Sequence, residues 1–339
     1  MGTGILAVAS YGNPGSVASL TSAAHVAGVT FAVVTAVLAL IVLTAVVIRW
    51  IRHTDAAMAD LRHPMRGGMH ATLPAALLVL AVTAATVSAS ATPMTLTTYA
   101  VAVLAIAGGL LSFIMGTTFM YMLFTGDQQV TTVNGAWFIP PVATVIVPMA
   151  LTPLVPHVDA GTGKVLLGIG YTFYGMGFLL FLLVLGLLFD RLVLHPMPAA
   201  PLAPTLWIAL GPIAVSSLAA MNLAKAGAGF WGPNAPVVGL ISQLFGTVIW
   251  GFGLWWLVLA AGLIIRYART GGIPFHLGWW AFVFPLGAYA AATVNVARAW
   301  GSTTLETVGV VLYLLLVAVW ATVMIRTLRA LVRGTIWVG

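Results

Sequence analysis

The sequence has 339 residues, of which 61% are hydrophobic and only 6% are charged, and its mean hydropathy is +1.10. Long uncharged apolar runs recur from end to end, which excludes a soluble domain and predicts an all-α, multi-pass membrane protein with one transmembrane domain over residues 1–339. The net charge of +7 does not indicate nucleic-acid binding, because the basic residues form no cluster with interleaved aromatic residues. The absence of cysteine excludes disulfides and cysteine metal sites.

Ten apolar segments are expected to form helices. In chain order they are Met1–Tyr11, Val26–Ile51, Ala71–Ser90, Leu96–Phe124, Val133–Met149, Val165–Leu192, Ala203–Leu223, Val237–Tyr267, Phe275–Trp300 and Thr304–Leu331. The first segment is too short to cross a hydrocarbon core of about 30 Å on its own.

The arginines predict the orientation in the membrane. Ten of them lie in the loops after the second, sixth and eighth segments or near the C-terminus: Arg49, Arg52, Arg62, Arg66, Arg191, Arg266, Arg269, Arg326, Arg329 and Arg333. The opposite side carries only Lys164, Lys225 and Arg298. Because basic loops stay on the cytoplasmic side, we expect a cell-membrane (inner or plasma membrane) protein with both termini in the cytoplasm.

Prolines separate the segments into two groups. Pro74, Pro140, Pro141, Pro148, Pro212 and Pro285 lie within odd-numbered segments, whereas the even-numbered segments are longer and have no interior proline. A proline leaves a backbone carbonyl without its partner, and such a group is tolerated in a membrane only beside protein or water. The pattern predicts five helical hairpins, with the odd helices as an inner five-helix pore and the even helices facing lipid.

The ninth segment, FHLGWWAFVFPLGAYAAATVNVARAW, carries the Phe284–Pro285 pair near its middle. At about 1.5 Å per residue, Phe284 lies roughly 13 Å from Phe275, close to the expected midplane. We interpret this segment as the constricted helix of an anion pathway. A short repeat supports the interpretation, because Trp207–Pro212 and Trp280–Pro285 both have the pattern W-x4-P. In this repeat Gly211 corresponds to Phe284. The glycine leaves space at the axis of the pore, and the phenylalanine can fill it.

Two basic residues are candidates for an outer vestibule that attracts anions. Lys225 follows the seventh segment and Arg298 ends the ninth on the same side. The alternative for Arg298 is an ion pair with Glu306 across the short loop, and the alternative for Lys225 is a solvated loop charge.

Four stretches resemble a known family: MGTGILAVA, NGAWFIPPVATVI, PTLWIALGPIAVSSLA and FHLGWWAFVFPLGAYAAAT. They are similar to the tellurite-resistance/dicarboxylate transporter family, which includes malic acid transport proteins, sulfite exporters and plant slow-type anion channels. The resemblance implies a homotrimer with one pore per subunit, and residues ahead of the part that matches Met1–Gly4. It also implies that Phe284 occludes the pore. The positions expected to line the pore or break its helices are Gly4, Pro140, Pro141, Gly211, Pro212 and Pro285.

The expected function is an anion channel or transporter without a cofactor, passing a C4-dicarboxylate such as malate, or sulfite, tellurite, nitrate or chloride. A coupled secondary exporter of organic anions or oxyanions is the first alternative. It is disfavoured because all six acidic residues fall in loops or at segment ends, whereas coupled transporters often use an intramembrane carboxylate. The second alternative is a metalloenzyme with a cytoplasmic site formed by His53, His63, His70, His195 and His276. None of these histidines has H-x-x-x-H or H-E-x-x-H spacing, so we expect neither an enzyme nor a metal site.

Overall fold

A computed structural model of the chain describes residues 1–63, 66–88, 96–126 and 133–334. Within these residues the chain is helical, and nine helical segments are long and apolar enough to span a bilayer. The predicted all-helical membrane class is therefore confirmed. The first predicted segment forms α1 (Gly2–Tyr11), an apolar helix below spanning length. Ser90, where the third predicted segment ends, lies outside the described residues.

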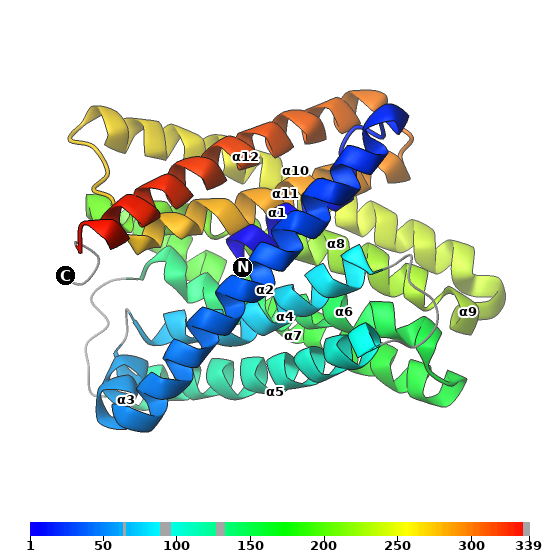
Figure 1. Ribbon diagram of the computed structural model, residues 1–339, viewed down its shortest axis with the longest axis horizontal. Helices are drawn as coiled ribbons and strands as arrows, with labels where there is room; N and C mark the ends of the chain where they lie inside the picture. Colours follow the sequence, from blue (N-terminus) through cyan, green and yellow to red (C-terminus); the bar gives the residue numbers. More distant parts are fainter. Residues whose placement is uncertain (64–65, 89–95, 127–132, 335–339) are drawn as a thin grey trace.

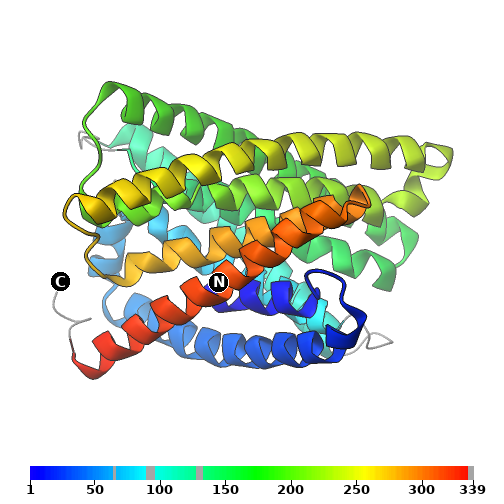
Figure 2. The same cartoon turned by 90° about the horizontal axis from the view of Figure 1, so that it is seen from above.

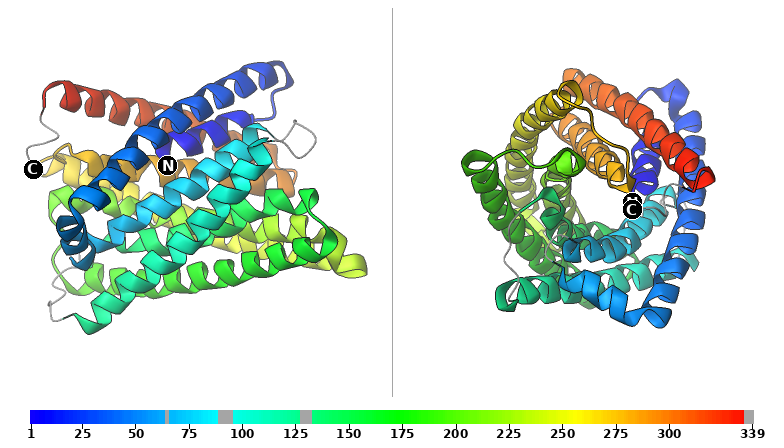
Figure 3. Two further views of the ribbon diagram at one scale, coloured as in Figure 1. Left: turned by 60° about the horizontal axis from the view of Figure 1, so that its bottom comes forward. Right: turned by 90° about the vertical axis from the view of Figure 1, so that its left-hand side faces the viewer.

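Five long helices form the outside of the bundle. They are α2 (Thr21–Arg52), α5 (Leu96–Thr125), α7 (Ala160–Leu194), α10 (Ala235–Arg269) and α12 (Thr303–Val332). Figure 3, in the view along the bundle, shows them surrounding the shorter helices. In the most apolar part of these five spans, 6–28% of the residues are buried. Leucine, valine and isoleucine dominate the exposed faces, which suits contact with lipid chains.

Five shorter helices form the inside: α1, α4 (Thr72–Val87), α6 (Ile139–Leu151), α8 (Leu210–Ala226) and α11 (Val283–Ala299). In the spans that contain α4, α6, α8 and α11, 39–89% of the most apolar part is buried. Each inner helix packs extensively against the outer helix that follows it. Glycines allow the paired helices to lie close together. A β-carbon on Gly177 of α7 would lie 2.6 Å from the backbone nitrogen of Val145 in α6, so a larger residue would clash there.

A short 3₁₀ helix precedes each of four inner helices: η2 (Gly67–Ala71), η3 (Gly135–Phe138), η5 (Ala200–Trp207) and η7 (Leu277–Phe282). The third residue of the α-helix that follows is a proline in every case: Pro74, Pro141, Pro212 and Pro285. Because the first N–H groups of an α-helix have no intrahelical partner, a proline there removes no hydrogen bond. At these four positions the predicted helix breaks are therefore helix starts, whereas Pro148 lies inside α6.

Several inner helices begin at one level in the middle of the bundle. A β-carbon on Gly2, the first residue of α1, would lie 3.0 Å from Val283, the first residue of α11. A β-carbon on Gly211, the second residue of α8, would lie 3.5 Å from Val142 near the start of α6. Figures 1 and 2 show the N-terminus in the middle of the molecule, beside the α11 start.

The remaining elements connect the helices: η1 (Ala18–Leu20), α3 (Thr54–Arg62), η4 (Thr152–His157), α9 (Ala228–Trp231) and η6 (Gly232–Asn234). Figure 1 shows α3 at the same end of the bundle as the C-terminus and α9 at the opposite end. The helix α3 was not predicted from the sequence. Asp60 holds it in place, because its carboxylate pairs with Arg49 at the end of α2 and with Arg66 ahead of η2.

Candidate functional site

A cavity of about 770 Å³ opens at the α9 end of the bundle and reaches toward its middle. We call this cavity the vestibule. All five inner helices line it, and apolar side chains dominate its wall: Ile5, Val79, Ile146, Leu218 and Ala288 come from α1, α4, α6, α8 and α11, respectively. The helices that the sequence assigned to the inside thus all line this space, together with residues of the outer helices α10 and α12 such as Gln243 and Tyr313.

Phe284, the second residue of α11, lines the vestibule at the level where α8 and α11 begin, and we call this inner end of the cavity its floor. Its side chain is 7% exposed. A β-carbon added to Gly211 in α8 would lie 3.7 Å from Cε1 of Phe284, so this glycine leaves room for about one methyl group beside the ring edge. Pro285 fixes the start of α11 directly behind the ring. The two residues that correspond in the predicted repeat, Gly211 and Phe284, are thus neighbours between α8 and α11.

Aromatic side chains follow Phe284 on the η7 side. The ring of Phe282 meets Trp207 and Trp279 edge to face, at centroid distances of 5.9 Å and 5.8 Å. The guanidinium carbon of Arg326 lies 4.7 Å from the ring centroid of Trp279. These side chains pack the bundle between the vestibule floor and the arginine-rich end.

Lys225 lines the vestibule near its mouth, in the last turn of α8. Its side chain is exposed, and its ammonium makes no hydrogen bond or ion pair with the residues that the structure describes. Among the residues that the structure describes, no aspartate or glutamate lines the vestibule. The ammonium charge therefore acts on the vestibule without a neighbouring carboxylate.

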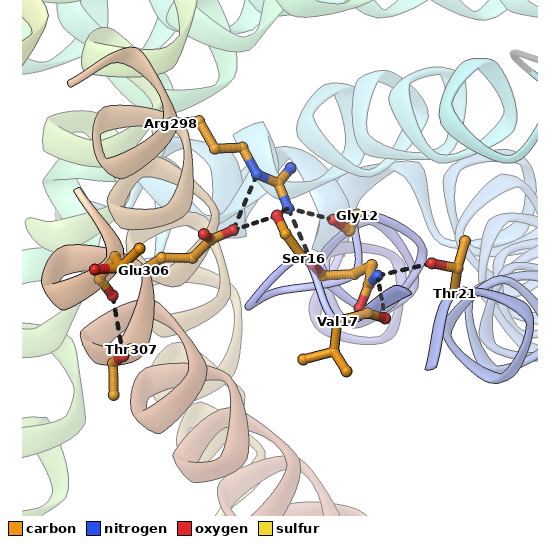
Figure 4. Close-up of polar contacts among 9 residues, drawn as sticks. Gly12, Ser16, Val17, Thr21, Arg298, Glu306 and Thr307 are labelled. Atoms are coloured by element: carbon orange, nitrogen blue, oxygen red, sulfur yellow. Dashed lines mark hydrogen bonds and ion pairs between the residues drawn. The ribbon is translucent and has the colours of Figure 1, made fainter. Parts of the chain in front are cut away.

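Arg298 also lines the vestibule, but its guanidinium is occupied (Figure 4). Its Nε lies 3.3 Å from Oε1 of Glu306. Its Nη2 donates to the carbonyl oxygens of Gly12 and Asn13, both at 2.9 Å, and to Oγ of Ser16 at 3.2 Å. The ion-pair alternative for Arg298 is thus the one that the structure shows. This residue fastens the loop after α1 to the ends of α11 and α12.

Gly4, Pro140 and Pro141 lie outside the vestibule wall. A β-carbon on Gly4 would meet Val79 of α4 at 2.8 Å, so this glycine allows close packing between α1 and α4. Pro140 faces α5, since a β-carbon on Gly116 would lie 3.8 Å from its Cβ.

Pro212 and Pro285 are buried in the first turns of α8 and α11 and do not line the vestibule either. Pro285 lies beside the floor, with its Cγ 3.8 Å from a β-carbon built on Gly211. The structure therefore brings Phe284, Gly211 and Pro285 together, and it places Lys225 and Arg298 at the far end of the same cavity.

Two residues of the vestibule wall did not stand out in the sequence, Asn222 and Asn295. Their only signal is a polar amide in an otherwise apolar segment. Asn222 donates to Sδ of Met149 at 3.3 Å, and Asn295 makes no side-chain hydrogen bond within the described ranges.

The histidines do not form a common site. In the described part of the chain, no three histidine, aspartate or glutamate side chains gather as metal ligands. His276 has a local role, since its Nδ1 accepts from the backbone N–H of Gly278 at 3.0 Å and its Nε2 lies 2.8 Å from the carbonyl oxygen of Pro201.

Comparison with known proteins adds the family. The SLAC1 family model, described as voltage-dependent anion channel, matches residues 1–328. The chain belongs to the SLAC1 family. An uncharacterized transporter of Methanocaldococcus jannaschii is 31% identical over 86% of this chain and 81% of its own length.

Other SLAC1-family relatives carry functional names. A sulfite efflux pump of Arthroderma otae is 28% identical over 61% of this chain and 56% of the pump. The malic acid transport protein of Schizosaccharomyces pombe is 25% identical over 65% of this chain and 52% of that protein. The family is thus one of channels and transporters rather than enzymes, and the resemblance inferred from the four sequence stretches is confirmed.

Proposed function

We propose that this protein passes small anions through the ring of α1, α4, α6, α8 and α11, with Phe284 as the gate. The observation that carries the proposal is the vestibule, which all five inner helices line and to whose wall Phe284 belongs. A dry aromatic constriction opposes a charged species, because the anion must lose its water there. Removal of the ring from the axis would open the path. The candidate substrates are malate or another C4-dicarboxylate, sulfite, tellurite, nitrate and chloride.

Passive conduction fits the vestibule better than coupled export. A proton- or sodium-coupled carrier commonly uses an intramembrane carboxylate, and no carboxylate lines the vestibule. An apolar wall with few charges also favours throughput, because an anion held by a buried arginine would leave slowly. Membrane current that reverses at the anion equilibrium potential would support a channel. Flux that requires a proton or sodium gradient would support the coupled exporter.

The proposed orientation places the vestibule on the outer face of the cell membrane. The opposite end carries Arg49, Arg66, Arg266 and Arg326, and the positive-inside rule assigns that end to the cytoplasm together with the C-terminus. The expectation of a cytoplasmic N-terminus does not fit the structure, because Met1 lies in the middle of the bundle. We propose a homotrimer in which each subunit has its own pathway. All five inner helices of one chain line the vestibule, together with residues of α10 and α12, which supports one pathway per subunit. Native mass spectrometry of the purified protein gives the subunit number directly.

The decisive experiment is reconstitution of the purified protein into liposomes, followed by flux measurements across the anion panel above. We expect anion flux above that of protein-free liposomes, with no flux of sodium or potassium. Correctly folded protein that passes none of these anions, with or without an imposed ion gradient, would contradict the proposed function.

A further inference from the structure

The repeat between α8 and α11 extends well beyond the tryptophan and proline. At a constant sequence separation, Trp207 corresponds to Trp280 and Pro212 to Pro285. Toward the helix ends, residues 222–226 read NLAKA and residues 295–299 read NVARA. Both helices therefore carry an asparagine followed three residues later by a basic residue. The corresponding positions of the other inner helices do not carry this pair.

Both copies of the pair face the same cavity. Residues three apart lie on one side of a helix, and Asn222, Lys225, Asn295 and Arg298 all line the vestibule. The helices α8 and α11 are neighbours in the bundle. Asn295 follows Phe284 by three helical turns, which is about 16 Å along the axis. The two amides therefore stand between the mouth of the vestibule and its floor.

The two asparagine–basic residue pairs differ in how many of their hydrogen-bond donors are free to bind an anion. Arg298 is bound to Glu306 and to the loop after α1, whereas Lys225 has no partner among the described residues. The Asn295 amide likewise makes no hydrogen bond to them. Asn222 uses one donor on the sulfur of Met149, a weak acceptor. Unused N–H groups from three side chains thus face a space whose remaining wall is largely apolar.

We infer that Asn222, Asn295 and Lys225 form an anion-binding site between the mouth and the gate, and that it selects small oxyanions, including carboxylates, over chloride. This inference rests on the proposed function. An oxyanion presents several oxygen acceptors, so both amides and the ammonium can bind different oxygens of one anion. Chloride offers a single centre and gains less from separated, directional donors. The neutral amides replace water without the tight hold of a second cation, which allows the anion to move on.

The test replaces each asparagine by leucine, which keeps most of the volume and removes the hydrogen bonds. Flux per folded protein is measured against concentration for malate, sulfite and chloride in liposomes. For Asn222→Leu and Asn295→Leu, the half-saturating concentration of the oxyanion should rise at least about tenfold each, as expected for a lost hydrogen bond to a charged group. Maximal flux should be retained, and the chloride value should change less than twofold. Asn295→Gln should recover part of the affinity.

Gln243 provides the matched control. It also lies at the vestibule, but its Nε2 donates to the carbonyl oxygen of Ala299 at 3.0 Å. Gln243→Leu should leave the half-saturating concentrations of all three anions near those of the parent. An effect of Gln243→Leu equal to that of the asparagine variants, or an equal effect on chloride and oxyanions, would overturn the site.

An equilibrium measurement separates this inference from the proposed function. Malate or sulfite should raise the Tm of the parent in detergent, and the double variant Asn222→Leu/Asn295→Leu should lose that increase. A parent that is stabilised by these anions but passes none would refute the proposed function and leave the site standing. A parent that conducts, with variants of unchanged affinity and unchanged Tm response, would refute the site alone.

Discussion

The ring of Phe284 lies next to Gly211. A β-carbon built on this glycine would lie 3.7 Å from Cε1 of Phe284 and 3.5 Å from Cγ2 of Val142. Both distances are ordinary van der Waals contacts, so a β-carbon would fit at Gly211, and this glycine leaves a space of about one methyl group beside the ring. These second residues of α8 and α11 lie at the level where the two helices begin, and we expect the pair to close the proposed path there. A change on either side of the contact should alter the closure.

Phe284→Ala should increase anion flux. The ring would no longer occupy the axis, and water could enter the constriction and lower the desolvation barrier. If the ring contributes as little as about 1.4 kcal/mol to the barrier, its removal raises flux about tenfold. Phe284→Leu should give an intermediate flux, measured per folded protein in liposomes. If Phe284 served only as core packing, its truncation would leave a cavity, lower the folded yield and give no gain.

Two further variants test the geometry of this gate. Phe282→Ala is the control, because Phe282 packs on Trp207 and Trp279 rather than on Gly211. Its flux should stay near that of the parent, and a larger gain than that of Phe284→Ala would defeat the assignment. In the Phe284→Ala background, Gly211→Leu should refill the same space and return flux toward the parental value.

The sequence was sufficient for the helical class and for the inner helices, because a membrane protein must place its apolar runs and its prolines according to what surrounds them. It also pointed to Phe284, since a phenylalanine before a proline near the middle of an apolar segment is distinctive. The sequence did not show that Pro141, Pro212 and Pro285 start α-helices rather than interrupt them. A proline suits both arrangements, and only the preceding 3₁₀ turns distinguish them.

Contacts between residues that lie far apart in the sequence could not be predicted from the sequence either. Arg298 donates to the carbonyl oxygens of Gly12 and Asn13, which lie near the other end of the sequence. The spacing of neighbouring residues does not predict such a contact. Helix α3 was not predicted, because it has only nine residues and its sequence is as polar as that of a loop. Its position depends on Asp60 meeting arginines from two other segments.

Lys225 and Arg298 should have separable effects. Lys225→Gln should reduce anion flux without a change in Tm. The reduction should be larger at low ionic strength, because electrostatic fields are screened over about 30 Å at 0.01 M salt but over about 8 Å at 0.15 M.

Arg298→Gln should instead lower the stability by about 1 kcal/mol, because the ion pair with Glu306 and the contacts with the loop after α1 are lost. Thermal unfolding in detergent and flux at two salt concentrations measure both. A salt-dependent flux loss from Arg298→Gln at unchanged Tm would contradict this division.

Asp60 should make the stability of the α3 end depend on pH. A hydrogen bond from Arg49, aided by the charge of Arg66, holds the pKa of Asp60 below its ordinary value of 3.8. Because the folded-state pKa is lowered, the stabilisation is present above pH 3.8 and disappears as the pH falls through the folded-state value. Asp60→Asn should therefore lower the Tm at neutral pH, by an effect of about 0.5–1 kcal/mol. The difference from the parent should shrink in acid.

The control for this prediction lies on the same helix. Asp55 makes no ion pair with the described residues, so Asp55→Asn should leave the Tm close to that of the parent at every pH. If the Asp60→Asn difference stayed constant into acid, the charge of Asp60 would not be the source of the stabilisation.

Single cysteines should map the vestibule, since the chain has no cysteine of its own. Ala291→Cys in α11 and Thr86→Cys in α4 place a thiol on half-buried positions of the wall, where water-soluble maleimide should react. Leu183→Cys and Val248→Cys lie on exposed faces of α7 and α10, where lipid excludes the thiolate form that the reagent needs.

Position 216 sharpens the same experiment. Ser216 is fully buried in α8 and does not belong to the vestibule wall, so Ser216→Cys should stay unreacted although its helix is an inner one. The expected order is therefore reaction at positions 291 and 86, and none at positions 216, 183 and 248. Equal reaction at positions 291 and 183 in lipid would show that the inner and outer helices do not differ in access to water. The inner helices would then not enclose a hydrated path.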